Sequence, residues 1–192
     1  MATQPIAEGK VESLCINGAP VQQIDFDLNG PRNDVHTGHF SRRLSGHDSE
    51  YIRTSSLKKG SYVFNWRSWT GLSQEDVAEI QHELGVTIPQ GCLLENIIVS
   101  GIPHFSRLEP TTRLIFPFRE NFPEGEQAIL TIWEQNGPCR TVGDRLAKFY
   151  GRHELMAKFV AAAKNRRGVM GFVLAAGLVR VGDTVLVYPP AS

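Results

Sequence analysis

The alternation of apolar and polar positions near the start of the chain predicts a β-hairpin. Residues 9–17, with the sequence GKVESLCIN, carry apolar side chains at alternate positions, as expected of a half-buried strand. The pair Asn17-Gly18 that ends this stretch is typical of a tight turn between two strands. A partner strand is therefore expected over 21–28, before the turn that begins at Asn29.

A change to a spacing of three and four residues predicts three helices farther along the chain. Over 73–84, Ser73 can cap the first turn, apolar residues fall on one face, and Gly85 follows the last turn. Residues 142–150 and 154–165 show the same spacing, and a glycine follows soon after each. These helices are short and stand between strand-like segments, so we expect them at the periphery of the fold.

The remaining apolar runs predict strands. Residues 92–102 are interrupted by the polar pair Glu95-Asn96, whereas 113–118 and 128–133 are rich in Ile, Leu, Phe and Thr. Turn signals divide the segment 169–188 into three further short strands. About seven or eight strands with few helices indicate a mainly β fold, a closed or nearly closed β-barrel with peripheral helices. We expect one domain over 1–192, with its core at about 9–188.

Composition narrows the partners that this fold could have. Lys and Arg together number 20, as do Asp and Glu, so the chain has no net charge to attract nucleic acid or an anionic membrane surface. No apolar run approaches the ~18 residues of a membrane span. We therefore expect a soluble, cytoplasmic protein that binds neither. Its three cysteines lack CxxC spacing, which supports neither a disulfide framework nor a zinc ribbon.

Cys139 is the residue at which we expect chemistry. It follows a Gly-Pro pair between a predicted strand and a predicted helix, where the helix dipole and the nearby Arg140 and Arg145 favour a thiolate. Such a thiolate can act as a nucleophile or as a metal ligand. The alternative is a half-buried core cysteine, because free cysteines are among the most buried residues. Cys15 and Cys92 lie within strand patterns, where a structural role is expected.

Residues 31–49 indicate a functional loop, because they hold three of the six histidines and few positions that could build a core. A metal site could draw on Asp34, His36, His39, His47 and Asp48. A loop lacks the register that a helix gives to His-x-x-His, so solvated or hydrogen-bonded histidines are the alternative.

Three polar pairs could face an anionic or polar ligand. Arg42-Arg43 and Arg166-Arg167 can make bidentate contacts with phosphate, with ordinary surface charge as the alternative. Glu95-Asn96 stands in an apolar strand and requires partners, either in an internal network or on the floor of a site. The chain lacks the GxxxxGK[ST], GxGxxG and GxSxG motifs, so the usual nucleotide-binding and hydrolase interpretations are unsupported.

Several of these motifs, taken in order, resemble the MOSC family, which is named for the C-terminal domain of molybdenum-cofactor sulfurases. They are Asp34-x-His36-x-Gly38 with Arg42-Arg43, then Glu95-Asn96-Ile97, Pro138-Cys139, and Gly168-x-x-Gly171 with Gly177 and Gly182-Asp183. The similarity covers residues 9–188 and points to a stand-alone member of bacterial type. The sequence carries Asn136 and Leu94 where arginine and glycine are frequent in the family.

The resemblance implies a barrel whose cysteine, here Cys139, ligates molybdenum or carries sulfur as a persulfide. The residues expected around a molybdenum cofactor (molybdopterin) are Asp34, His36, Arg42, Arg43, Glu95, Asn96 and Arg140. They should line one cleft at a barrel mouth, with Cys139 reachable by solvent.

Three functions remain open, and it is also open whether the protein is an enzyme. The first is a cofactor-binding protein, with a reductase of small N-hydroxylated compounds as its enzymatic form. The second is a sulfur carrier, and the third is a non-catalytic binding barrel. Because these residues contain no pyridoxal-binding domain, a carrier would need a separate cysteine desulfurase. A reductase would need an electron-transfer partner.

Overall fold

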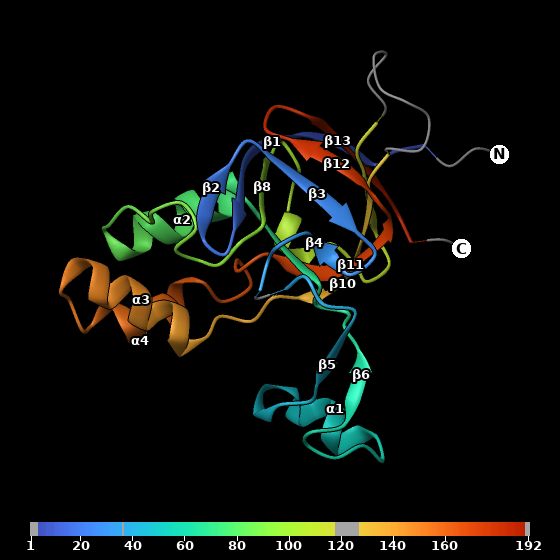
Figure 1. Cartoon of the computed structure of the whole chain (residues 1–192). Coiled ribbons are helices and arrows are strands. Elements are labelled where there is room, and N and C mark those ends of the chain that lie inside the picture. Colours follow the sequence, from blue (N-terminus) through green and yellow to red (C-terminus); the bar gives the residue numbers. More distant parts are fainter. Residues whose placement is uncertain (1–3, 36, 118–126, 191–192) are drawn as a thin grey trace.

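Strands close into a barrel in the computed structural model, which describes residues 4–35, 37–117 and 127–190 (Figure 1). In order of pairing, the seven strands of the ring are β13 (Thr184–Tyr188), β9 (Arg113–Ile115), β10 (Ile129–Gln135), β11 (Val169–Ala175), β7 (Trp69–Ser73), β8 (Ile97–Ser100) and β1 (Ala7–Ile16). The ring closes because β13 also pairs with β1, and β2 (Ala19–Val21) extends it as an extra strand. The predicted mainly β, closed barrel is confirmed.

Two smaller sheets and the helices lie outside this ring. The smaller sheets consist of β3 (Gln23–Asp27), β4 (Gly30–Pro31) and β12 (Gly177–Arg180), and of β5 (Ser41–Arg43) with β6 (Tyr62–Phe64). Within the described ranges the helices are α1 (Ser49–Thr54), α2 (Gln74–Leu84), α3 (Arg140–Tyr150) and α4 (Leu155–Ala162), with 3-10 turns η1 (Gly46–Asp48) and η2 (Phe105–Arg107). None of these helices is long and apolar enough to cross a membrane.

The first hairpin forms at the predicted turn, but its second strand is shorter than predicted. Asn17 and Gly18 both take a positive φ, of 53° and 78°, and β2 pairs with the end of β1. The chain then bends, and β3 leaves to pair with β12 and β4. One continuous strand over 21–28 was therefore wrong, because the bend allows Ile24 and Phe26 to enter the barrel core.

Helix α2 serves as the crossover between two parallel strands. It begins at its predicted cap, where Ser73 Oγ accepts a hydrogen bond of 3.1 Å from the Asp76 amide, and it ends at Gly85, which has a φ of 64°. Strands β7 and β8 pair in parallel, and parallel neighbours need a crossover connection, which is usually a helix. The sequence predicted the helix but not β7, which precedes it.

Two apolar clusters stabilise the fold. The first fills the barrel and includes Trp69 and Phe105, both fully buried. The second lies outside the ring, where Leu72 on β7 packs with buried residues of α2, α3 and α4. Alternate residues of a strand point to opposite faces, so β7 can contribute to both clusters. This outer cluster fixes the position of α3, and with it Cys139.

Residues 40–64 form a projection that we call the arm. It consists of β5, η1, α1 and β6, and Figure 1 shows it extending away from the barrel. Its two strands pair antiparallel, with Arg43 opposite Tyr62 and Ser41 opposite Phe64. The predicted loop over 31–49 is therefore only partly correct, because its second half belongs to this hairpin, whose apolar positions are too few to give a strand signal.

Three predicted strands have different ends in the structure. Strand β8 begins only at Ile97, because Gly91 and Leu94 take positive φ values of 76° and 57° and hold the preceding residues in turns. Strand β9 ends at Ile115, and part of the predicted stretch 113–118 lies outside the described residues. Strand β10 continues to Gln135, which brings the end of the strand closer to Cys139.

A close approach of two barrel strands yields a stability prediction. A Cβ added at Gly171 on β11 would lie 1.8 Å from the backbone oxygen of Thr131 on β10. Gly171→Ala should therefore lower the free energy of unfolding by about 3 kcal/mol, because backbone atoms must move. Urea unfolding measures this change.

Gly46→Ala is the matched control, because an added Cβ there meets nothing within 4 Å. It should change stability by no more than ~1 kcal/mol. Equal stability of the two variants would contradict the packing of β10 against β11 described here.

Candidate functional site

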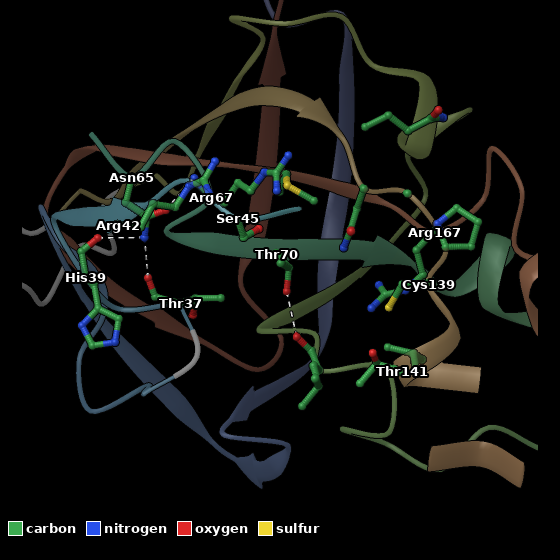
Figure 2. A pocket seen from close by; sticks show the side chains of 17 residues that line it. Thr37, His39, Arg42, Ser45, Asn65, Arg67, Thr70, Cys139, Thr141 and Arg167 are labelled. Atoms are coloured by element: carbon green, nitrogen blue, oxygen red, sulfur yellow. Dashed lines mark hydrogen bonds between the residues drawn. The ribbon is translucent and has the colours of Figure 1, made fainter. Parts of the chain in front are cut away.

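A pocket of about 540 Å³ opens at one end of the barrel, between the arm and helix α3 (Figure 2). Four parts of the chain line it. The first is the start of the arm with the residues before it (Thr37, His39, Arg42, Ser45), and the second is the segment that leads into β7 (Asn65, Arg67, Thr70). The third runs from the end of β10 to the first turn of α3 (135–139, 141 and 142), and the fourth consists of Leu94, Arg167 and Met170. Residues of the 34–48 segment and Cys139 thus line one pocket, but of the other residues expected in the cleft only Arg42 lines it among the described residues.

Cys139 stands at the N-terminus of α3 and lines this pocket. It is the N-cap residue, with an extended backbone (φ −126°, ψ 154°), and its carbonyl accepts a hydrogen bond of 3.3 Å from Gly143. Its side chain makes no capping hydrogen bond and is only partly buried. Cys139 thus lines the pocket as a partly exposed residue, and it also packs against the outer apolar cluster.

The position of Cys139 follows from the residues that precede it. The amide of Asn136, just after β10, donates a hydrogen bond of 2.9 Å to the carbonyl of Gly168. Gly168 in turn has a φ of 82°, and a Cβ there would lie 1.9 Å from the oxygen of Gly71. This glycine lets the chain before β11 lie tightly against β7, so that Arg167 and Cys139 reach the same pocket wall.

Arg167 is a buried guanidinium with unused donors. The residue is 4% exposed, and its Nη2 donates to the carbonyl of Leu93, whereas its Nε and Nη1 have no hydrogen-bond partner among the described residues. Burial lowers the pKa of Arg167, while Glu95, Cys139 and Cys92 act against that shift. Figure 2 shows its side chain beside that of Cys139. A positive charge in this setting favours an anion next to the thiol.

Glu95 lies behind this wall and does not line the pocket. It is 2% exposed, and its Oε1 accepts a hydrogen bond of 2.5 Å from the Gly91 amide. Burial raises the pKa of Glu95, against the hydrogen bonds and the charge of Arg167 that lower it. The Cys15 thiol donates to the same Oε1 over 3.9 Å, and burial followed by the Glu95 charge raises the pKa of Cys15 to about 12. Cys15 is thus a structural thiol.

Asn96 and Asp34 form an internal network instead of a ligand-facing pair. Asn96 Nδ2 donates to Asp34 Oδ2 over 2.9 Å, and Asn96 Oδ1 accepts from the Thr70 amide over 2.9 Å and from Thr37 Oγ1 over 3.2 Å. Asp34 also accepts hydrogen bonds from the amides of Asn17 and Thr37. The sequence left open whether this polar residue belongs to an internal network or to the floor of a site, and the hydrogen bonds of Asn96 favour the internal network. Through it, Thr37 and Thr70 are held at the pocket wall.

Asp48 ties the arm to the barrel. Its carboxylate accepts hydrogen bonds of 2.9 and 2.7 Å from Arg42, and Arg67 lies 3.1 Å from it. Burial alone would raise the pKa of Asp48, but the hydrogen bonds from Arg42 and Ser45 outweigh it and hold the pKa well below its usual range. Arg67 also pairs with Glu134 on β10 at 2.5 Å. One pocket wall is therefore fixed by a series of ion pairs that joins Arg42, Asp48, Arg67 and Glu134.

Other predicted site residues lie elsewhere. Arg43 stacks on Tyr62 on the outside of the arm, Arg140 is exposed and does not line the pocket, and Arg166 pairs with Glu79 and Glu83 of α2. Arg43 and Arg140 therefore remain outside the cleft in which they were expected.

The histidines give no metal site in the part of the chain that the structure describes. His36 lies outside the described residues, whereas His39 is at the pocket rim, with its Nε2 3.1 Å from the carbonyl of Val35. Among the described residues, no group of three or more His, Cys, Asp or Glu side chains could hold a metal ion. Among the described residues, Cys139 is therefore the soft thiolate ligand that this pocket offers to a metal.

The sequence analysis missed pocket residues that carry no motif. Asn65 holds the base of the arm by donating from Nδ2 to the carbonyls of Thr37 (3.1 Å) and His39 (2.8 Å). Arg67 and Thr70 lie in a segment for which no element was predicted. A signal was present in the cluster of Asn65, Trp66 and Arg67, but single polar residues near a strand do not reveal which face they occupy.

Comparisons with known proteins place the chain among related sequences and structures. The model of the MOSC domain matches residues 65–186. YuaD of Bacillus subtilis strain 168, whose name provisionally assigns it to metal-sulfur cluster biosynthesis, is 29% identical over 171 residues, which are 88% of this chain and 81% of YuaD.

Solved structures show a similar fold. The crystal structure of YuaD from Bacillus subtilis has a TM-score of 0.81 at 26% identity, covering 96% of this chain and 97% of that one. YiiM from Escherichia coli has a TM-score of 0.53 at 14% identity, covering 95% and 71%, and shares the fold.

The buried carboxylate of Asp48 gives a prediction with a defined pH dependence. Asp48→Asn should lower the free energy of unfolding at pH 7 by about 2 to 3 kcal/mol, because Arg42 and Arg67 lose their counter-charge. Since the folded-state pKa of Asp48 is lowered, its contribution is complete above the unfolded-state value of about 3.9 and declines as the pH falls below it. Urea unfolding of both proteins from pH 3 to 7 measures this.

Asp144→Asn provides the comparison, because Asp144 pairs with Lys148 on the exposed face of α3. It should cost at most ~0.5 kcal/mol at any pH. A wild-type advantage over Asp48→Asn that does not shrink in acid would show that the carboxylate charge is not what ties the arm.

Proposed function

Because the chain belongs to the MOSC domain family, we propose that it binds a molybdenum cofactor and that Cys139 ligates the metal. The observation that carries this proposal is the pocket itself, which places a partly buried thiol and a buried, under-used guanidinium in one space of about 540 Å³. Such a volume is in the range of ~300–1,000 Å³ that suits cofactor-sized ligands. A pocket that only received one sulfur atom on a thiol would not need a volume of this size.

The residues present fit such a group. A thiolate is the soft ligand that suits the metal, and Arg167 supplies a positive charge next to it for an anionic oxygen. Arg42 and Arg67 line the same pocket, with part of their charge already matched by Asp48. Thr70 and Thr37 add hydroxyl groups at the wall. Charged, hydroxyl and soft donors are therefore all available to a pterin-bound metal.

When bound, the cofactor would supply two-electron redox chemistry, such as the reduction of a small N-hydroxylated compound. The chain's own contribution would be to hold the metal through Cys139 and to orient the anionic end by Arg167. Electrons would come from a separate protein. Such a role would suit the cytoplasm, where free thiols like those of the three cysteines persist.

A second candidate is a sulfur carrier, which the name of YuaD favours. The Cys139 thiolate would attack the outer sulfur of a donor persulfide, so that the donor's S–S bond breaks and the donor leaves as a thiolate. Cys139 would then hold the sulfur as a persulfide until an acceptor thiolate takes it. The partly buried thiol meets the requirement for access. The donor would be a separate cysteine desulfurase, and the acceptor a metal-sulfur cofactor or its enzyme.

Replacement of the thiol separates the two candidates. Protein purified from a host that makes the cofactor should contain molybdenum, whereas Cys139→Ser should lose most of it, because a hard, protonated hydroxyl replaces a soft thiolate. Metal analysis by mass spectrometry measures the content per chain. Cys92→Ser is the control, since Cys92 is also partly buried but does not line the pocket, and it should keep the metal.

Metal-free wild-type protein would contradict the cofactor proposal. If such protein gains one sulfur atom at Cys139 on incubation with a cysteine desulfurase and cysteine, the sulfur carrier takes its place. If it gains none, both candidates fail and a binding barrel without this chemistry remains.

Arg167 allows a test of the anionic contact. Arg167→Met should weaken cofactor binding by about tenfold to a hundredfold, the range of a charge-assisted interaction of 1.5 to 3 kcal/mol. The stability of the cofactor-free protein should fall little, because the buried charge has few partners. Arg166→Gln, which alters a surface ion pair, should leave the affinity unchanged. Equal molybdenum retention by both variants during dialysis would remove Arg167 from the site.

A further inference from the structure

Exposed aromatic side chains form a continuous surface from the arm to the outside of the barrel. On the arm, Phe40, Tyr62 and Phe64 are 61%, 65% and 44% exposed, and on β10 Trp133 is 36% exposed. Phe172 on β11 lies between them and is partly buried. We call these five residues the aromatic stripe. Large apolar side chains that gather on one face and remain in water mark a binding surface.

Ring contacts show that the stripe is one surface. Phe64 contacts Phe40 with ring centres 5.6 Å apart and Phe172 with ring centres 5.5 Å apart, both edge to face. Phe172 in turn lies 6.3 Å from Trp133. Tyr62 joins at the other end, two residues from Phe64 on the same strand. Ring contacts therefore link the arm, through Phe64 and Phe172, to Trp133 on β10, and Tyr62 lies beside Phe64 on the same face of β6.

The register of the hairpin places Tyr62 and Phe64 of the stripe on the face opposite Arg42. Arg43 pairs with Tyr62 and Ser41 with Phe64, so these four side chains share one face, and Arg43 stacks on Tyr62 at 4.1 Å. Arg42, between them in sequence, points to the other face, where it lines the pocket. The stripe is thus close to the pocket but outside it, and the proposed function does not use it.

Positive charge collects at the end of the stripe. Residues 40–64 hold five Lys or Arg and two Asp or Glu, in a chain whose total charge is zero. Lys58 and Lys59 are exposed in the turn before β6, and Gly60 in that turn accepts a hydrogen bond of 3.2 Å from Arg43. The cations are therefore adjacent to Tyr62. Aromatic side chains with arginine are the residues most enriched at protein interfaces.

We propose that the aromatic stripe and the cations beside it bind a protein partner whose contact surface is apolar at its centre and acidic at its edge. The charge of the arm selects the acidic edge, and the rings supply the apolar contact. A protein seated there contacts the outer face of the arm, whose inner face contributes Arg42 to the Cys139 pocket. This surface is independent of which chemistry Cys139 performs.

A second copy of the chain fits this surface less well. Its densest acidic element is α2, and the carboxylates of α2 already have partners within the chain: Glu75 with the Gly101 amide, Asp76 with Ser106, and Glu79 and Glu83 with Arg166. A nucleic acid fits less well too, because Arg43 covers the ring of Tyr62 and Phe64 packs edge to face on its neighbours, which leaves fewer ring faces for stacking bases. An acidic protein is therefore the occupant that we infer.

Site-specific photo-crosslinking tests the proposal in cells of the source organism. A benzophenone amino acid placed at position 40 or 62 of the full chain should cross-link to one acidic protein, which mass spectrometry identifies. The same amino acid at position 149 is the control, because Phe149 on α3 is 64% exposed but lies outside the stripe. No cross-link at 40 and 62, an equal one at 149, or one to a second copy or to nucleic acid would overturn the proposal.

The identified partner, once purified, is then titrated against variants. Phe40→Ala, and Lys58→Glu with Lys59→Glu, should each weaken binding about tenfold or more, and added salt should reduce only the effect of the lysine changes. Phe149→Ala should bind as the wild type does. Unchanged affinity in both stripe variants would overturn the assignment of this surface.

Discussion

The arrangement of the molecule depends on the closure of the barrel between its first and last strands. Strand β1 pairs with β13 through residues 7–10, with β8 through residues 10–14 and with β2 through residues 14–16, and its register with β8 is irregular between Val11 and Ser13. This irregularity bends β1, so that one strand can serve both sides of the ring. Because the ring is closed, the segments around residues 37–45, 94, 135–142 and 167–170 meet at one end of it. The pocket is a product of closure, not of any single motif.

The sequence predicted correctly those features that depend on interactions between residues close together along the chain. The cap at Ser73, the glycine after α2 and the Asn17-Gly18 turn each act within a few residues, and each was found where it was predicted. The division of the segment after this turn was not predictable, because it depends on β12, more than 150 residues away. The arm was missed for a related reason. Its hairpin depends on Asp48 and on ring contacts, which leave no periodic pattern.

In the site too, some positions were predictable from neighbouring residues, whereas others depend on parts of the chain that are distant in sequence. The position of Cys139 just before a helix was predictable from the sequence, whereas the different surroundings of Arg166 and Arg167 were not. These neighbours have opposite surroundings, one on the surface beside α2 and the other buried at the pocket, because Gly168 fixes the backbone that follows. Leu94 is a similar case. It takes a φ of 57°, a conformation that costs a residue with a side chain about 1–2 kcal/mol, and it does so at the pocket wall where the family often has glycine.

Strand β5 separates two environments by the thickness of a single backbone. Arg42 faces the pocket and Asp48, while Arg43, the next residue, faces water beside Tyr62. A turn of the backbone of this three-residue strand moves both side chains together, because consecutive side chains lie on opposite faces. A contact that turns this backbone from the outer face would therefore also move Arg42 on the inner face. The arm therefore connects the interior of the pocket to the solvent-exposed surface through a single short strand.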